Sequence, residues 1–103
     1  MDEEEIPGDF RLLCAAVVTQ AIADACCVRA GALRLRGIEW ALANRRPPRT
    51  GEERAAAVTA RAWLAGAAGP ITAEEACQAV GVRLARVIEV VLGQIPLAHR
   101  RAA

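Results

Sequence analysis

The residues best suited to binding a ligand are arginines, grouped at two places in the chain. Arg83 and Arg86 stand in the middle of the stretch ITAEEACQAVGVRLARVIEVVL, residues 71–92, and Glu89 follows one turn later. Guanidinium groups near the N-terminus of a helix can contact phosphates or guanine edges in the major groove. The spacing therefore predicts binding to double-stranded DNA through Arg83, Arg86 and Glu89.

The second group of arginines lies in the proline-containing segment ANRRPPRTG, residues 43–51. Arg45, Arg46 and Arg49 crowd this short loop, and one interpretation is a clamp for DNA phosphates. The alternative is a solvated linker whose arginines interact favourably with the C-terminus of the preceding helix.

Residues for catalysis or metal binding are scarce. The single histidine, His99, is near the C-terminus, and the cysteines form no C-x-x-C motif. Zinc needs about four convergent ligands, and catalysis needs a positioned nucleophile, base or metal. We therefore expect no enzymatic activity, no metal and no other cofactor. We interpret the cysteines as small buried residues of a reduced cytoplasmic protein: Cys14, Cys26, Cys27 and Cys77.

The net charge of +1 hides an asymmetry along the chain. Residues 1–9 carry five acids and no base (−5), whereas residues 10–103 carry 13 arginines against seven acids (+6). Such a body suits phosphate contacts, although the pI of 7.7 is below the value of about 9 typical of strong nucleic-acid binders. The absence of lysine indicates GC-rich coding, as in many bacteria and their phages.

One apolar segment, residues 12–28, has to be tested as a membrane span. It contains 17 residues with Asp24 among them, whereas a span needs about 20 apolar residues. Residues 2–5 are also acidic where a signal peptide carries a basic region. We therefore expect a core helix and no membrane association.

Hydrophobic periodicity predicts five helices and no strand, which makes the fold class all-α. The helices are expected at about 9–28, 32–45, 50–65, 72–80 and 83–92, with Thr50–Glu53 and Thr72–Glu75 as capping boxes. They form one compact helical domain, residues 9–96, ending in a helix-turn-helix-like hairpin at 72–92. A disordered acidic tail (1–8) and a disordered C-terminal tail (97–103) flank it.

The first three helices each have an expected inward face. These faces are Phe10, Leu13, Cys14, Val17 and Ala21 in the first helix, Leu35, Ile38, Ala41 and Leu42 in the second, and Val58, Ala62 and Ala65 in the third. The first helix is apolar all round and must be covered on most sides. It is therefore either the central helix or half of the interface of a homodimer or higher oligomer.

The hairpin has the residue types that a helix-turn-helix requires. Cys77 is the small residue at the helix crossing, Gly81 forms the turn, and three valines anchor the second helix: Val82, Val87 and Val90. Leu84, Ile88 and Leu92, however, form an apolar stripe on the same helix, which favours packing against the first helix or against a partner protein. Trp40 lies off the apolar face of its helix, so it either covers a neighbouring helix or is a second candidate for such a protein interface.

Three short segments carry a resemblance to known proteins. They are Gln20-Ala21-Ile22-Ala23-Asp24-Ala25, Ala62-Trp63-Leu64 and Cys77…Gly81…Val87. In these segments the chain resembles small helical, helix-turn-helix-like proteins of prophages and prophage-like clusters of alphaproteobacteria, over about residues 12–90. The resemblance implies a phage context and a helix-turn-helix-like hairpin. The group usually carries a proline and a Val-Arg pair after the glycine, whereas residues 82–87 lack proline and Ile88 replaces the arginine.

Two functions follow from these features. The first is a small phage- or prophage-type DNA-binding protein, either a transcription regulator or a DNA-packaging factor. The alternative is a non-enzymatic adaptor or inhibitor that binds a host or phage protein. It would bind through Trp40 or through the apolar stripe of Leu84, Ile88 and Leu92.

Overall fold

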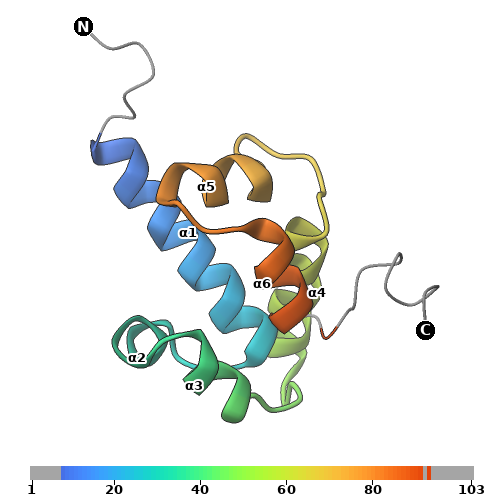
Figure 1. Ribbon diagram of the computed structural model, residues 1–103. Coiled ribbons are helices and arrows are strands. Elements are labelled where there is room, and N and C mark those ends of the chain that lie inside the picture. The colour runs from blue at the N-terminus through green and yellow to red at the C-terminus, as the bar shows by residue number, and fades with distance from the viewer. Residues whose placement is uncertain (1–7, 92, 94–103) are drawn as a thin grey trace, which may run out of the picture.

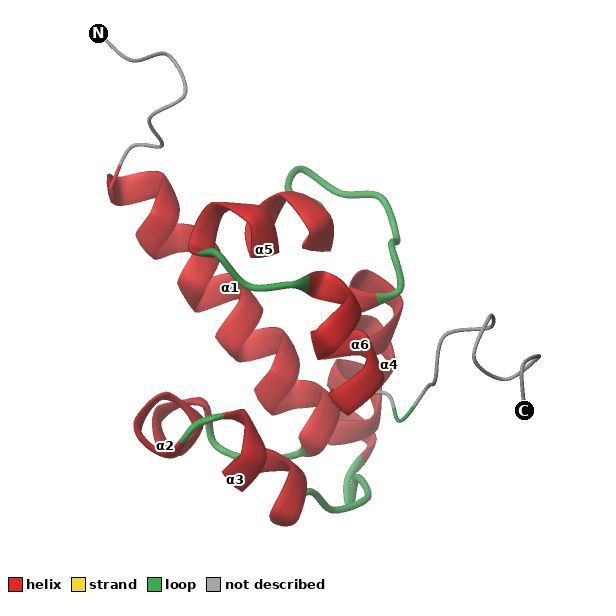
Figure 2. Cartoon of the chain, in the orientation of Figure 1, coloured by secondary structure: helices red, strands yellow, loops and turns green. Residues whose placement is uncertain are grey.

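Six α-helices make up the part of the chain that the computed structural model describes, residues 8–91 and 93 (Figure 1). They are α1 (Gly8–Cys26), α2 (Ala30–Arg36), α3 (Ile38–Ala43), α4 (Gly51–Leu64), α5 (Ala73–Val80) and α6 (Leu84–Val91). Loops connect them, and no strand occurs within these residues (Figure 2). The all-α class is thus confirmed. The expected tails, apart from Gly8 in α1, lie outside the described residues, as does Leu92.

Helix α1 is the central element, because it contacts each of the other five helices. Its buried side chains include Cys14, Val18 and Ile22. The predicted inward face was wrong at its N-terminal end, where Phe10 is 38% and Leu13 is 51% exposed. The first turns of α1 extend past the helices that cover the rest of it (Figure 1), so apolar side chains there are only partly covered.

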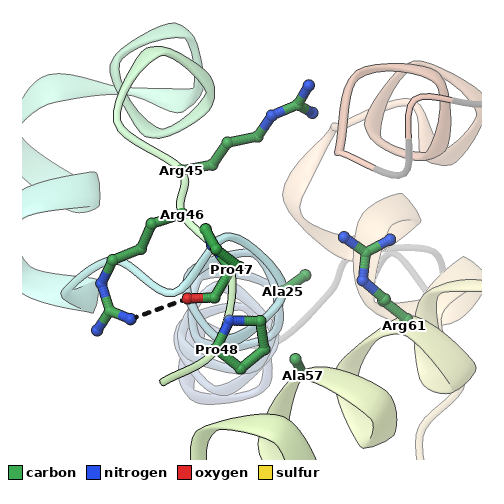
Figure 3. Close-up of a pocket in the computed structure, with 7 residues that line it drawn as sticks. All are labelled: Ala25, Arg45, Arg46, Pro47, Pro48, Ala57 and Arg61. Atoms are coloured by element: carbon green, nitrogen blue, oxygen red, sulfur yellow. Dashed lines mark hydrogen bonds between the residues drawn. The ribbon is translucent and has the colours of Figure 1, made fainter.

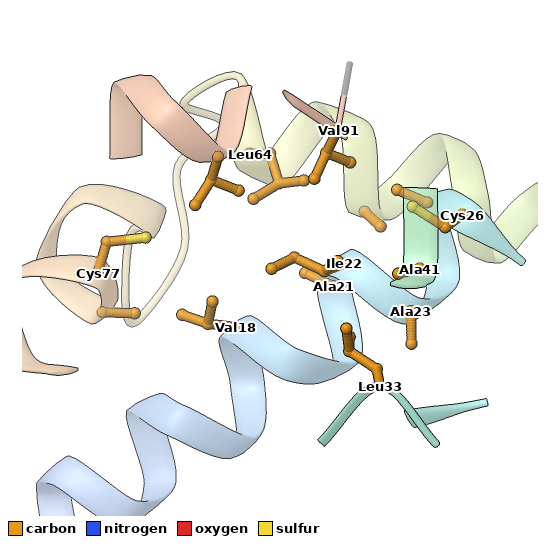
Figure 4. Close-up of a cluster of buried hydrophobic side chains, with 14 of the residues drawn as sticks. Val18, Ala21, Ile22, Ala23, Cys26, Leu33, Ala41, Leu64, Cys77 and Val91 are labelled. Atoms are coloured by element: carbon orange, nitrogen blue, oxygen red, sulfur yellow. The ribbon is translucent and has the colours of Figure 1, made fainter. Parts of the chain in front are cut away.

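The core consists of small side chains in close contact (Figure 4). Its largest fully buried members are Leu64, Val87, Val91, Cys14, Cys26 and Cys77. Alanines from α1, α3, α4 and α5 fill most of the remaining space, which lets the helix backbones approach closely. The interpretation of Cys14, Cys26 and Cys77 as buried apolar residues is confirmed, whereas Cys27 is only half-buried.

The helix expected at 32–45 is in fact two helices, and Gly37 separates α2 from α3. Gly37 has φ = +91°, a conformation that glycine adopts readily and other residues rarely do. The break also turns Leu35 outward, to 87% exposure, so its assignment to the inward face was wrong. Ala41, in α3, is fully buried as expected.

Helix α4 keeps the expected start but shows a different face to the core. Ala57, Ala60 and Leu64 are buried, whereas Val58 is 62% exposed. The remaining predicted inward residues, Ala62 and Ala65, are exposed as well. An alanine-rich helix has weak amphipathicity, so its sequence does not distinguish between these neighbouring faces.

Within the described residues no single helix is both long and apolar enough to cross a membrane. Helices α1 and α2 reach that length and composition only as a pair, which bends by 107° between them.

Candidate nucleic-acid interface

The hairpin formed by α5 and α6 begins with a complete capping box. The Thr72 hydroxyl accepts from the N–H of Glu75 at 3.2 Å, and the Glu75 carboxylate accepts from the N–H of Thr72 at 2.9 Å. The hydrogen bonds that the Glu75 carboxylate accepts from the N–H and the hydroxyl of Thr72 lower the pKa of Glu75. Both partners satisfy N–H groups that a helix N-terminus leaves without intrahelical acceptors.

Gly81 ends α5 and fixes the direction of the turn. Its φ is +77°, and its N–H donates to Gln78 O at 3.2 Å while the N–H of Val82 donates to Cys77 O at 2.8 Å. This pair of bonds is the Schellman motif, in which a left-handed residue lets the chain leave the helix with its last carbonyls satisfied. Residues 81–83 form the turn, and α6 starts at Leu84. The predicted helix, glycine turn and second helix are therefore present.

The apolar side of α6 faces the protein. Val87 and Val91 are each 1% exposed, and half-buried Leu84 packs against the core. Ile88 is half-buried too. Of the expected anchors, Val82 is 40% exposed in the turn, and the side chain of Val90 lies outside the described residues. The stripe that suggested a free protein interface is thus partly covered by this chain's own core at Leu84.

The outward side of α6 carries small and charged residues. Ala85, Arg86 and Glu89 are exposed, and so is Arg83 in the turn just before α6. Nη1 of Arg86 lies 3.6 Å from Oε1 of Glu89, with the two side chains 64% and 46% exposed. An exposed ion pair of this length is held weakly, so Arg86 can exchange Glu89 for another anion at little cost. The three hairpin residues predicted to bind DNA therefore share one accessible surface.

Arg46 does not belong to a free phosphate clamp, contrary to the sequence-based hypothesis. Its Nη1 and Nη2 donate to the two Glu53 carboxylate oxygens at 3.0 and 2.6 Å. The N–H of Arg49 donates to the same carboxylate at 2.7 Å. These hydrogen bonds lower the pKa of Glu53 to about 2, and the bond from Arg46 has the largest effect.

This engagement also corrects the capping box predicted at Thr50. The Thr50 hydroxyl still accepts from the N–H of Glu53 at 3.0 Å. The Glu53 carboxylate, however, makes its closest hydrogen bonds to the 45–49 loop, and the N–H of Thr50 is the weakest of the donors that lower its pKa. A bidentate guanidinium–carboxylate pair forms two parallel charge-assisted hydrogen bonds, whereas a capping box gives the carboxylate only one, which accounts for the choice. Arg46 and Glu53 therefore fasten the loop to α4.

Arg45 and Arg61 flank a hollow of about 410 Å³, which we call the arginine hollow (Figure 3). Arg45 comes from the loop after α3 and Arg61 from α4, and both residues line this hollow. Arg46 also borders it, and the rest of the lining is Ala25, Pro47, Pro48 and Ala57. Sequence reasoning did not identify Arg61, since a lone arginine on a helix gives no signal of which loop will face it.

The positive charges of Arg45 and Arg61 also act on the buried thiol of Cys26. Burial raises the pKa of Cys26, and the positive charges of Arg45 and Arg61 act in the opposite direction. Both guanidinium groups are thus close enough to act on the same buried atom. The sequence places these two arginines 16 positions apart, and the fold brings them to one site.

Trp40 is half-buried and packs against the core, with Cζ of Arg36 lying 5.8 Å from its ring centroid. Of the two roles that the sequence allows for Trp40, the structure provides contact with neighbouring helices. Among the described residues no group of three or more histidine, cysteine, aspartate or glutamate side chains could hold a metal ion.

The comparisons with known proteins return no match: no family model fits the chain, and neither the curated proteins nor the solved structures contain a similar one. The structure itself thus provides the basis for the functional argument.

Proposed function

We propose that this chain is a small phage- or prophage-type DNA-binding protein whose α6 enters the major groove. The observation that carries the proposal is the division of α6 into two sides. Its apolar residues Val87 and Val91 are buried, and its exposed side presents Arg86, with Arg83 exposed in the turn just before it. The apolar stripe was the main objection to a DNA-reading helix, and its partial burial at Leu84 weakens that objection.

The dimensions and residue types of α6 support this docking. An α-helix with its side chains is about 10–12 Å across, which fits the major groove of about 12 Å, and the eight residues of α6 provide two turns of such a helix. Ala85 is small enough to allow close approach to bases. Arg83 and Arg86 can donate to guanine or to phosphates, and Glu89, once released by Arg86, can accept from cytosine N4.

The biological role that fits such a small protein is a transcription regulator or a DNA-packaging factor. Binding as a homodimer would place two α6 helices on successive major grooves, as in other helix-turn-helix proteins. All four cysteines are free thiols, in keeping with a reducing cytoplasm.

The proposal is tested by fluorescence anisotropy with a labelled duplex at about 50 mM and about 200 mM salt. We expect binding at micromolar protein that weakens steeply with salt, because each neutralised phosphate releases counterions. Arg83→Gln and Arg86→Gln should each weaken binding at least about fivefold, since a base contact contributes about 1–3 kcal/mol. Arg36→Gln is the control: it removes the same charge from α2, where Arg36 covers Trp40.

Absence of binding at micromolar protein and low salt would contradict the proposal. Equal losses for Arg36→Gln and Arg86→Gln would contradict the specific role of α6 and leave only non-specific charge attraction. Either result would favour the alternative, a protein that binds a host or phage protein. That alternative must then use a surface other than Leu84, because Leu84 already packs on this chain's own core.

A further inference from the structure

We propose that the arginine hollow is a phosphate site in which Arg45 and Arg61 share one phosphate group. We take the phosphate to come from the backbone of a DNA duplex bound by α6, and in this respect the inference rests on the proposed function. It concerns a second, separate contact, formed by the loop after α3 and by α4 instead of by the hairpin.

The loop that carries Arg45 is held in place before any ligand arrives. The N–H of Arg46 donates to Cys26 O at 3.1 Å, which docks the loop on the C-terminal end of α1. The Arg46 side chain is fastened to Glu53 at 2.6 Å, and Pro47 and Pro48 restrict the backbone beyond it. Arg45 is therefore presented from a fixed loop, which lowers the entropic cost of binding.

The charge of the hollow is positive and available. The carboxylate of Glu53 offsets the charge of Arg46. Arg45 and Arg61, in contrast, form no ion pair with any residue that the structure describes, and no acidic residue lines the hollow. Two guanidinium groups facing one opening match the several oxygens of a phosphate, which arginine binds with paired N–H donors.

The lining suits a phosphate ester better than a free ion in water. The side chains of Ala25, Ala57, Pro47 and Pro48 in the lining are apolar. A less polar surrounding strengthens the attraction between the guanidinium groups and the phosphate. The volume of about 410 Å³ exceeds that of a phosphate alone and leaves room for the attached sugar.

The position of the hollow relative to α6 links it to the proposed duplex. Arg61 precedes Leu64 by one helical turn, and Leu64 packs beside Val91, the last residue of α6 (Figure 4). The arginine hollow is thus near the C-terminal end of α6, whereas Arg83 and Arg86 lie at its N-terminal end. A duplex that receives α6 in its groove can place a backbone phosphate at the hollow.

The first arm of the test uses the free protein and inorganic phosphate at constant ionic strength. We expect saturable shifts of the Arg45 and Arg61 Nε–H signals in a ¹H–¹⁵N NMR titration. Arg45→Gln should abolish the shifts at Arg61, and Arg61→Gln those at Arg45. Shifts that do not saturate, or that persist at one arginine when the other is replaced, would overturn the inference.

The second arm measures how the DNA affinity depends on salt concentration. A single shared phosphate contributes about 0.9 to the slope of log K against log salt. Arg45→Gln and Arg61→Gln should each reduce the slope by about 0.9, and the double variant should lose no more than either single one. Additive losses would mean that two separate phosphates are bound, and unchanged slopes that none is; both outcomes contradict the inference.

The two arms separate the failure of this inference from that of the proposed function. Saturable phosphate binding without any binding of duplex DNA would support the phosphate site and refute the proposed function. Binding of DNA through Arg83 and Arg86 with no response at Arg45 and Arg61 would support the proposed function and refute the phosphate site.

Discussion

Val87 should contribute far more to stability than Val58, although the sequence suggests an inward position for both. Val87, in α6, is 1% exposed and belongs to the core, whereas Val58, in α4, is 62% exposed. The same substitution by alanine at the two positions therefore isolates the effect of burial, because both valines lie inside helices.

The expected cost of Val87→Ala follows from the atoms that it removes. Two buried methyl groups contribute about 0.8 kcal/mol each. The vacated space, roughly 50 Å³, adds up to about 1 kcal/mol if neighbouring side chains do not close it. The better helix propensity of alanine returns about 0.5 kcal/mol. The free energy of unfolding should thus fall by about 2 kcal/mol, and Tm by about 8–16 °C for a domain of this size.

Val58→Ala should leave Tm unchanged or raise it slightly, since only the gain of about 0.5 kcal/mol in helix propensity applies there. Thermal unfolding followed by circular dichroism at 222 nm measures both variants against the parent chain. The reasoning fails if Val58→Ala is as destabilising as Val87→Ala, because α4 would then face the core as its sequence suggests. It fails equally if Val87→Ala costs less than about 1 kcal/mol.

Two further predictions concern the turn and the loop that support the two arginine surfaces. Gly81→Ala should lower the free energy of unfolding in urea by about 1–2 kcal/mol, because φ is +77° at this position. Gly31→Ala should raise it by about 0.5–1 kcal/mol, because Gly31 lies inside α2 with open space around it. The Glu53 carboxylate, with its pKa of about 2, stabilises the fold above pH 4.5, and this contribution is lost as the pH falls toward 2. The stability difference between the parent chain and Glu53→Gln should therefore shrink between pH 6 and pH 3; a constant difference would refute the assigned ion pair.

The hairpin is the part of the site that the sequence predicted best. Its signals are local: Thr72 and Glu75 are three residues apart, and the conformation of Gly81 depends on its own backbone. Hydrogen bonds over such short separations need no tertiary contact. The residues of the second helix also keep a strong division into apolar and charged sides, so Val87 was assigned to the core and Arg83 and Arg86 to the surface correctly.

The roles of the three loop arginines could not be predicted from the local sequence. Arg45, Arg46 and Arg49 are equivalent by sequence, yet each has a different role in the structure. The side chain of Arg46 pairs with Glu53, and Arg45 borders the arginine hollow. The backbone N–H of Arg49 donates to the Glu53 carboxylate. The choice depends on how α4 is oriented against the loop, and that orientation is a property of the packed core.

By itself the sequence determined the all-α class, the helix ends at Thr50, Thr72 and Gly81, and the residue types of the hairpin, because these depend on short-range hydrogen bonds and periodicity. Only the tertiary structure decided which face each alanine-rich helix buries and which distant residues meet. A weakly amphipathic helix can pack on several of its faces with similar burial of apolar surface. The packing of the helices around one core determines which of these faces is buried. The meeting of Arg45 and Arg61 follows from that packing.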